Sequence, residues 1–178
     1  AILQGVFFNP EADDAVNYGA IGGVIGHEMS HGFDDEGSKY DGDGMLKDWW
    51  TPKDRAEFDG RTGKLVKQFD AYTPLPGKHV NGKLTLGENI GDLGGITVAY
   101  EAYRRSLNGA EAPVIEGFTG DQRFFMGWAQ VWRSAIRDEA LEQQLGTDPH
   151  SPAEYRVNGL MPNVPAFYKA FGVKEGDK

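Results

Sequence analysis

The chain has 178 residues, of which 39% are hydrophobic and 25% are charged, and this composition is typical of a single globular domain with a substantial core. Its net charge of -9 argues against a nucleic acid partner, because phosphate groups bind to basic surfaces. The chain has no apolar run long enough to span a membrane. It also has no cysteine, so any zinc site in it must use histidine and carboxylate ligands.

The first predicted helix begins near Asp13 and Asp14 and ends near Phe33. Four glycines in its interior are spaced at i, i+3, i+4 and i+7, and each costs up to about 1 kcal/mol relative to alanine: Gly19, Gly22, Gly23 and Gly26. Such spacing makes a bare stripe that lets another backbone approach closely. We therefore expect this helix to be buried, with His27 and His31 beside the stripe.

Loops and a second helix follow. The composition of residues 34–46 predicts a loop. The N-cap pair Thr51–Pro52 predicts the start of a helix that continues to about residue 72, with breaks at its glycines. The segment 73–86 is rich in proline, glycine and asparagine, and it is expected to be a connection with a short hairpin at Asn81–Gly82.

Apolar residues at near-helical spacing predict two further helices, over residues 87–106 and 121–139, and short helices near 152–160 and 163–171 complete the chain. The helix at 121–139 carries an aromatic stripe that is more economically explained as core than as a ligand-binding surface: Phe124, Phe125, Trp128 and Trp132. The sequence therefore predicts a mainly α fold.

The segment HEMSH lies near the end of the first predicted helix. His27 and His31 are four residues apart, so on a helix they share a face and can bind one metal ion. Glu28 is next to His27 and would lie near that ion without binding it, as in the HExxH motif. The alternative is an ordinary helix that carries these residues by chance. The expected burial of the helix favours the metal site, because such side chains are costly to bury unless they coordinate or pair.

A catalytic zinc site needs a third protein ligand. The segment GENIGDLGG supplies Glu88 and Asp92, which are four residues apart and therefore share a helix face. One carboxylate can bind the ion while the other accepts a hydrogen bond from a ligand imidazole. The alternative is that Glu88 only stabilises a helix N-terminus, and spacing alone leaves the two interpretations open.

Four longer segments carry a resemblance to a known family: GGVIGHEMSHGFDDEGSKYDGDGMLKDWW, LGENIGDLGG, FFMGWAQVWR and PHSPAEYRVNG. In order and spacing they resemble the neprilysin and endothelin-converting-enzyme family of zinc metallopeptidases. The resemblance implies the C-terminal helical part of a gluzincin, a thermolysin-like catalytic domain, in which one Zn²⁺ ion is bound by His27, His31 and Glu88.

The same resemblance implies roles for further residues. Glu28 would be the general base and proton shuttle, while Asp34 and Asp92 would orient the ligand histidines, with Asp92 counted among the catalytic residues. His150 and Arg156 match a histidine and an arginine that line the site in the family. His150 could stabilise the developing oxyanion, and Arg156 could hold a substrate carbonyl or carboxylate. Without the resemblance, both would be interpreted as ordinary loop and surface residues.

The resemblance also implies that residues 1–178 are the C-terminal portion of one catalytic domain. In the family, an edge strand with an Asn-Ala-aromatic motif and a large helical domain precede the matching segment. The expected partners are an oligopeptide substrate and the upstream part of the same protein. The expected reaction is peptide-bond hydrolysis, and the alternative is an inactive zinc-binding or interaction fragment. The family favours an extracellular or periplasmic location, and the absence of cysteine favours a bacterial source.

Overall fold

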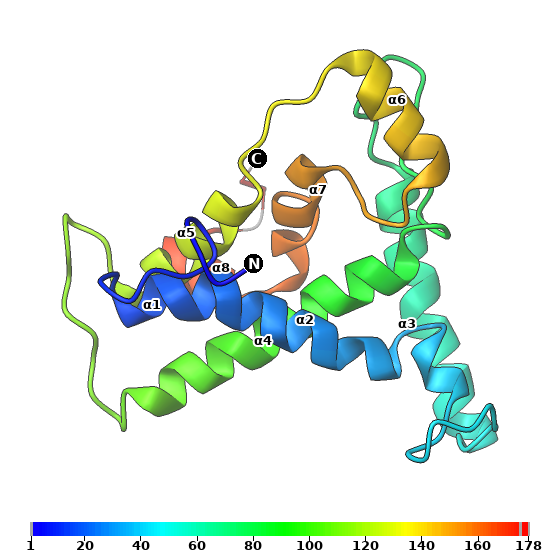
Figure 1. Ribbon diagram of the computed structural model, residues 1–178, viewed down its shortest axis with the longest axis horizontal. Helices are drawn as coiled ribbons and strands as arrows, with labels where there is room; N and C mark the ends of the chain where they lie inside the picture. Colours follow the sequence, from blue (N-terminus) through cyan, green and yellow to red (C-terminus); the bar gives the residue numbers. More distant parts are fainter. Residues whose placement is uncertain (1, 175, 178) are drawn as a thin grey trace.

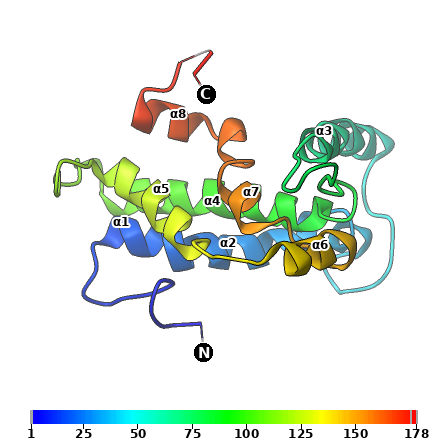
Figure 2. The same cartoon turned by 90° about the horizontal axis from the view of Figure 1, so that it is seen from above.

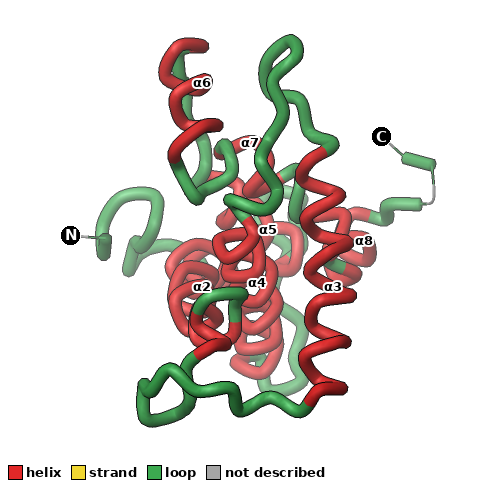
Figure 3. The backbone as a smooth tube through the Cα atoms, turned by 90° about the vertical axis from the view of Figure 1, so that its right-hand side faces the viewer, coloured by secondary structure: helices red, strands yellow, loops and turns green. Residues whose placement is uncertain are grey.

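The structure is a computed structural model that describes residues 2–174, 176 and 177. In this part of the chain the regular structure is helical, and β-pairing is limited to isolated bridges (Figure 3). The predicted mainly α fold is confirmed. None of the helices described is both long and apolar enough to cross a membrane.

The first predicted helix is confirmed, and the structure divides it into four consecutive segments: α1 (Asp14–Asn17), a π-helical turn (Tyr18–Gly22), α2 (Gly23–Ser30) and a 3-10 turn (His31–Phe33). Together they form one long rod, drawn in blue in Figure 1. Both predicted ligand histidines lie near its C-terminal end.

Helix α4 (Leu86–Ser106) runs antiparallel to this rod and lies directly against it (Figures 1 and 2). The glycine stripe makes this contact possible. A Cβ atom added to Gly26 would lie 2.7 Å from the carbonyl oxygen of Gly95, and one added to Gly22 would lie 3.7 Å from the Cβ of Ala99. The antiparallel register brings the end of α2 to the beginning of α4, and therefore brings the two predicted ligand segments together.

Helix α5 (Gly120–Val131) packs beside α4 on the same glycine stripe of the rod, and it begins with a capping box between Thr119 and Gln122. Gly23 faces the indole of Trp128, which is fully buried. The main core lies between the rod, α4, α5 and the C-terminal segments, and its largest members are aromatic or long aliphatic residues: Tyr103, Phe124, Phe125, Trp128, Ile96 and Leu160.

Helix α3 (Pro52–Asp70) begins where the Thr51–Pro52 pair predicts, and the Thr51 side chain accepts a hydrogen bond from the Asp54 amide. The predicted breaks at its glycines are wrong. Gly60 and Gly63 face open space, and a cost of about 1 kcal/mol each does not interrupt a helix that is capped and anchored by burial. A second core cluster provides that anchor: Leu65, Phe69, Val80 and Leu86.

The predicted hairpin at Asn81–Gly82 is also wrong. The Asn81 carbonyl accepts a hydrogen bond from the Thr85 amide at 3.0 Å, and the Gly82 amide donates to Asp70 Oδ1 at 2.7 Å. These bonds connect the end of α3 to the start of α4, so the segment is a helix-to-helix turn. The isolated bridge in this connection joins Leu75 and Lys78 instead.

The helix predicted over residues 121–139 ends early, at Val131, and the chain is non-helical from residue 133 to residue 137. The Trp132 ring is covered by the guanidinium of Arg156, 3.7 Å from the ring centroid, and the residues that follow are exposed. A separate helix, α6 (Asp138–Thr147), follows and has no buried residue. The last predicted short helices correspond to α7 (Ala153–Val157), a 3-10 turn (Met161–Asn163) and α8 (Pro165–Phe171).

Candidate metal centre

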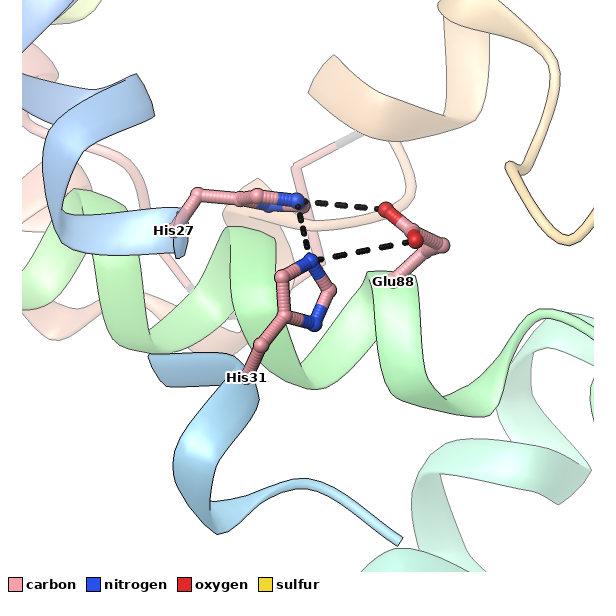
Figure 4. A group of neighbouring side chains, drawn as sticks. All are labelled: His27, His31 and Glu88. Atoms are coloured by element: carbon pink, nitrogen blue, oxygen red, sulfur yellow. Dashed lines mark hydrogen bonds and ion pairs between the residues drawn. The ribbon is translucent and has the colours of Figure 1, made fainter. Parts of the chain in front are cut away.

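The end of α2 and the start of α4 bring His27, His31 and Glu88 together (Figure 4). His27 Nε2 lies 3.0 Å from His31 Nε2 and 3.2 Å from Glu88 Oε2, and His31 Nε2 lies 3.8 Å from Glu88 Oε1. Two ligand atoms at about 2.1 Å from a tetrahedral zinc ion lie about 3.4 Å from each other. The side chains therefore have both the donor types and the spacing that zinc requires.

The close approach of α2 and α4 also depends on Gly91 of α4. A Cβ atom added to Gly91 would lie 2.9 Å from His27 Cε1, so the imidazole occupies the space that a larger residue would fill. His27 is buried with 6% of its surface exposed, and His31 is half-buried. In the described part of the chain, these two histidines and Glu88 are the one group of three or more metal-binding side chains whose ligand atoms converge within 4.8 Å.

Each histidine donates its Nδ1 proton to a carboxylate. His27 Nδ1 lies 2.8 Å from Asp92 Oδ1, and His31 Nδ1 lies 2.8 Å from Asp34 Oδ2. Asp34 is itself held by the amides of Glu36 and Gly37, at 2.8 and 2.7 Å. With Nδ1 protonated, the lone pair of each ring is on Nε2 and is directed to the same point.

The electrostatics of the group also fit a cation. Burial alone would lower the pKa of His27, but the Asp92 and Glu88 carboxylates raise it to about 9, so a metal must displace a proton from this ring. Burial alone would raise the pKa of Glu88, but the neighbouring imidazoles lower it. Glu88 Oε2 is buried without a hydrogen bond in proper geometry. A bound cation would give this oxygen a partner and would balance the negative charge of the Glu88 carboxylate.

Arg156, on α7, is buried against the same group. It donates from Nε to Asp92 Oδ2 at 2.7 Å and from Nη2 to Asp92 Oδ1 at 2.6 Å, and its plane stacks on the Trp132 ring. Two of its five N–H donors therefore hold Asp92, and both N–H groups of Nη1 and the second N–H of Nη2 remain for a ligand. Trp132, expected to be part of the core, thus contributes to the neighbourhood of the site.

His150 lies in the loop before α7, with its Nε2 atom 3.0 Å from Glu88 Oε2. Asp148 Oδ1 accepts hydrogen bonds from both the His150 ring Nδ1 and the His150 amide, each at 2.8 Å. An open pocket of about 680 Å³ lies beside His150, Arg156 and Trp132. The structure therefore brings His150 Nε2 to the ligand group, and in the protonated imidazole, where both ring nitrogens carry a proton, this atom is a donor.

Glu28 is exposed on the solvent side of α2, directly after His27. No hydrogen bond or ion pair joins its side chain to the other described residues, so its carboxylate is free to contact a ligand beside the two histidines. The sequence interpretation missed Asp148. Its position two residues before His150 was the available signal, because an aspartate often accepts bonds from amides and side chains two residues further on.

The sequence model of Peptidase family M13 matches residues 1–178 of this chain. Among curated proteins, the chain is 47% identical over 171 residues to Neprilysin-11 of Caenorhabditis elegans, covering 93% of this chain and 20% of that protein. It is 44% identical to Endothelin-converting enzyme 1 of Homo sapiens, covering 98% of this chain and 23% of that protein. The chain thus spans about a fifth to a quarter of the length of these relatives.

Solved structures give the same result at the level of the fold. The zinc metalloprotease Zmp1 of Mycobacterium tuberculosis, determined with an inhibitor, is 59% identical with a TM-score of 0.97, and the match covers 99% of this chain and 28% of that one. PEPO from Lactobacillus rhamnosis HN001 is 39% identical with a TM-score of 0.86, over 99% of this chain and 26% of that one.

Proposed function

The chain belongs to Peptidase family M13, a family of zinc metallopeptidases, and from this membership we propose that it is the C-terminal portion of the catalytic domain of a zinc endopeptidase that hydrolyses oligopeptides. One Zn²⁺ ion is held by His27, His31 and Glu88. The upstream part of the same polypeptide completes the substrate cleft. The observation that carries the proposal is the convergence of two imidazoles, each backed by a carboxylate, on one glutamate.

When bound, zinc lowers the pKa of water and polarises the carbonyl of the scissile bond. Glu28 accepts the proton of the attacking water as the C–O bond forms, and it then delivers this proton to the amine nitrogen as the C–N bond breaks. The exposure of Glu28 beside a buried His27 supports this role. The base must reach a water molecule at the coordination position that the three protein ligands leave open.

His150 and Arg156 contribute donors around the reacting carbonyl. His150 Nε2 is directed to the ligand group, where the protonated imidazole can donate from Nε2 to the oxygen that becomes negative in the tetrahedral transition state. Arg156 holds Asp92 in place through two hydrogen bonds, and its Nη1 can bind a substrate carbonyl or carboxylate. The pocket beside these two residues has room for a substrate side chain, and the apolar surface of Trp132 on its wall favours an apolar residue after the cut.

The test combines metal analysis with hydrolysis of a quenched fluorescent peptide by the zinc-loaded full polypeptide. Glu28→Gln removes the base but leaves all three ligands, so we expect about one zinc per protein and a fall in kcat of roughly 10²- to 10⁴-fold. Glu57→Gln, on the exposed face of α3, is the matched control and should leave kcat unchanged. Unchanged hydrolysis in Glu28→Gln with zinc still bound would contradict the proposal and favour a zinc-binding interaction module instead.

A further inference from the structure

Three buried polar side chains next to the candidate metal centre have no part in the proposed mechanism. They are Thr85, Asn89 and Ser151, and their exposed fractions are 3%, 1% and 1%. Burying polar groups without partners is unfavourable, so their partners indicate what they do.

The three side chains form a hydrogen-bonded chain with one direction. The Thr85 hydroxyl donates to the Asn81 carbonyl at 3.1 Å, so its oxygen accepts from Asn89 Nδ2 at 3.0 Å. This orients the Asn89 amide with Oδ1 outward, where it accepts from the Ser151 hydroxyl at 2.8 Å. Because each group already donates to the next, the amide cannot turn over without breaking two of these bonds.

The chain of hydrogen bonds ends at two positions adjacent to site residues. Asn89 follows Glu88 on α4, and Ser151 follows His150 in the loop before α7. Asp148 fixes the His150 ring relative to its own loop, since both residues lie in that loop. It cannot fix the loop relative to α4. The Ser151–Asn89 bond can, because it joins the two elements beside the 3.0 Å approach of His150 Nε2 to Glu88 Oε2.

We propose that Asn89 and Ser151 are positioning residues that hold His150 against the Glu88 end of the metal centre. Ser151 supplies the donor on the loop, and Asn89 supplies an acceptor whose orientation is set by Thr85. Neither residue touches the substrate, and both act through His150. The effect on hydrolysis rests on the proposed function, whereas the effect on the position of the loop does not.

The first test therefore measures the loop without using activity. In the zinc-loaded full polypeptide, Ser151→Ala should raise amide hydrogen exchange in residues 148–152 by roughly fivefold or more, because one buried hydrogen bond is lost. Exchange in α5 should stay unchanged. Ser106→Ala, which removes a hydroxyl that donates to the Tyr103 carbonyl at the far end of α4, is the control. Unchanged exchange in residues 148–152 overturns the proposal, even if the protein proves to have no peptidase activity.

The second test asks whether Ser151 acts through His150. Ser151→Ala should lower kcat by roughly 10- to 100-fold, as expected when a catalytic group is displaced by about 1 Å, with the bound zinc unchanged. In a His150→Ala background, the same substitution should have no further effect on kcat. An equal loss in both backgrounds would mean that Ser151 only supports the fold, and would overturn the proposal.

Ser151→Cys covers the case in which the alanine variant folds poorly. The thiol fills the same space but is a weak donor, so we expect an effect of the same kind and smaller size in both measurements. A cysteine variant with native exchange and native kcat would overturn the proposal. Absence of hydrolysis in the unsubstituted protein would instead contradict the proposed function, and the exchange measurement would still decide the role of Ser151.

Discussion

At the scale of single residues, the two carboxylates behind the proposed ligand histidines are not equivalent. Asp34 contacts His31 and two backbone amides. Asp92 contacts His27 and also accepts hydrogen bonds from the Arg156 guanidinium. Only 1% of the surface of Asp92 is exposed. A change at Asp92 therefore disturbs a buried ion pair as well as a histidine, whereas a change at Asp34 tests the orienting role with less disturbance of the fold.

We therefore predict that Asp34→Asn lowers zinc affinity by about 10- to 100-fold. The amide still fills the space of the carboxylate, but it can no longer accept a charge-assisted bond from His31 Nδ1. Competition with a chromogenic chelator measures the affinity. Asp43→Asn, in the exposed loop after α2, is the control with the same change of charge. Equal zinc affinity in Asp34→Asn and the native protein would mean that Asp34 does not orient the ligand.

Several of these residue contacts could be predicted from local spacing. His27 and His31, four apart on one helix, and Glu88 and Asp92, four apart on another, follow from helical periodicity. The Arg156 bond to Asp92 spans 64 residues and depends on how α7 packs, so periodicity carries no information on it. Likewise, the Ser151–Asn89 bond joins residues 62 apart, and each residue alone would be interpreted as an ordinary polar side chain.

At the scale of elements, the candidate site depends on the contact between α2 and α4. Glycines on both helices set the distance between them, since Gly26 faces the Gly95 backbone and Gly91 faces the His27 ring. The stripe on the first helix was predictable because its four glycines lie on one face. The length of the helix after Gly120 was not, because the apolar pattern continues to residue 136 while the packing against the core stops near Trp132.

Two glycine-to-alanine substitutions should change the free energy of unfolding in opposite directions, because Gly26 lies in the contact between α2 and α4 and Gly60 faces open space. Gly26→Ala places a Cβ atom 2.7 Å from the Gly95 carbonyl oxygen and should lower the free energy of unfolding by about 1–3 kcal/mol. Gly60→Ala, on the open face of α3, should raise it by about 0.5–1 kcal/mol through helix propensity. Urea unfolding of the metal-free protein measures both. Equal effects at the two positions would show that the helices do not need the glycine at residue 26.

At the scale of the whole molecule, the proposed zinc ligands come from segments that are far apart in sequence. His27 and Glu88 are separated by a loop, by α3 and by the turn that was expected to be a hairpin. The order of these elements could be predicted, but their three-dimensional arrangement required the antiparallel packing of α2 on α4. An ion bound by both helices would link the end of the first to the start of the second, and would do so only in the folded chain.

Zinc removal should therefore lower stability, because the ion binds the folded state and the unfolded chain does not present the three ligands together. With free zinc at 1,000 times its Kd, the expected stabilisation is about 4 kcal/mol. It would appear as a higher urea midpoint in zinc than in chelator. Glu88→Ala removes one ligand and should abolish most of this difference, whereas Glu57→Ala on α3 should retain it. Hydrogen exchange should locate the stabilisation in α2 and the first turns of α4, where the ligands lie. A stabilisation that persists in Glu88→Ala would place the ion elsewhere in the molecule, since neither histidine can then be linked to α4 through a shared metal.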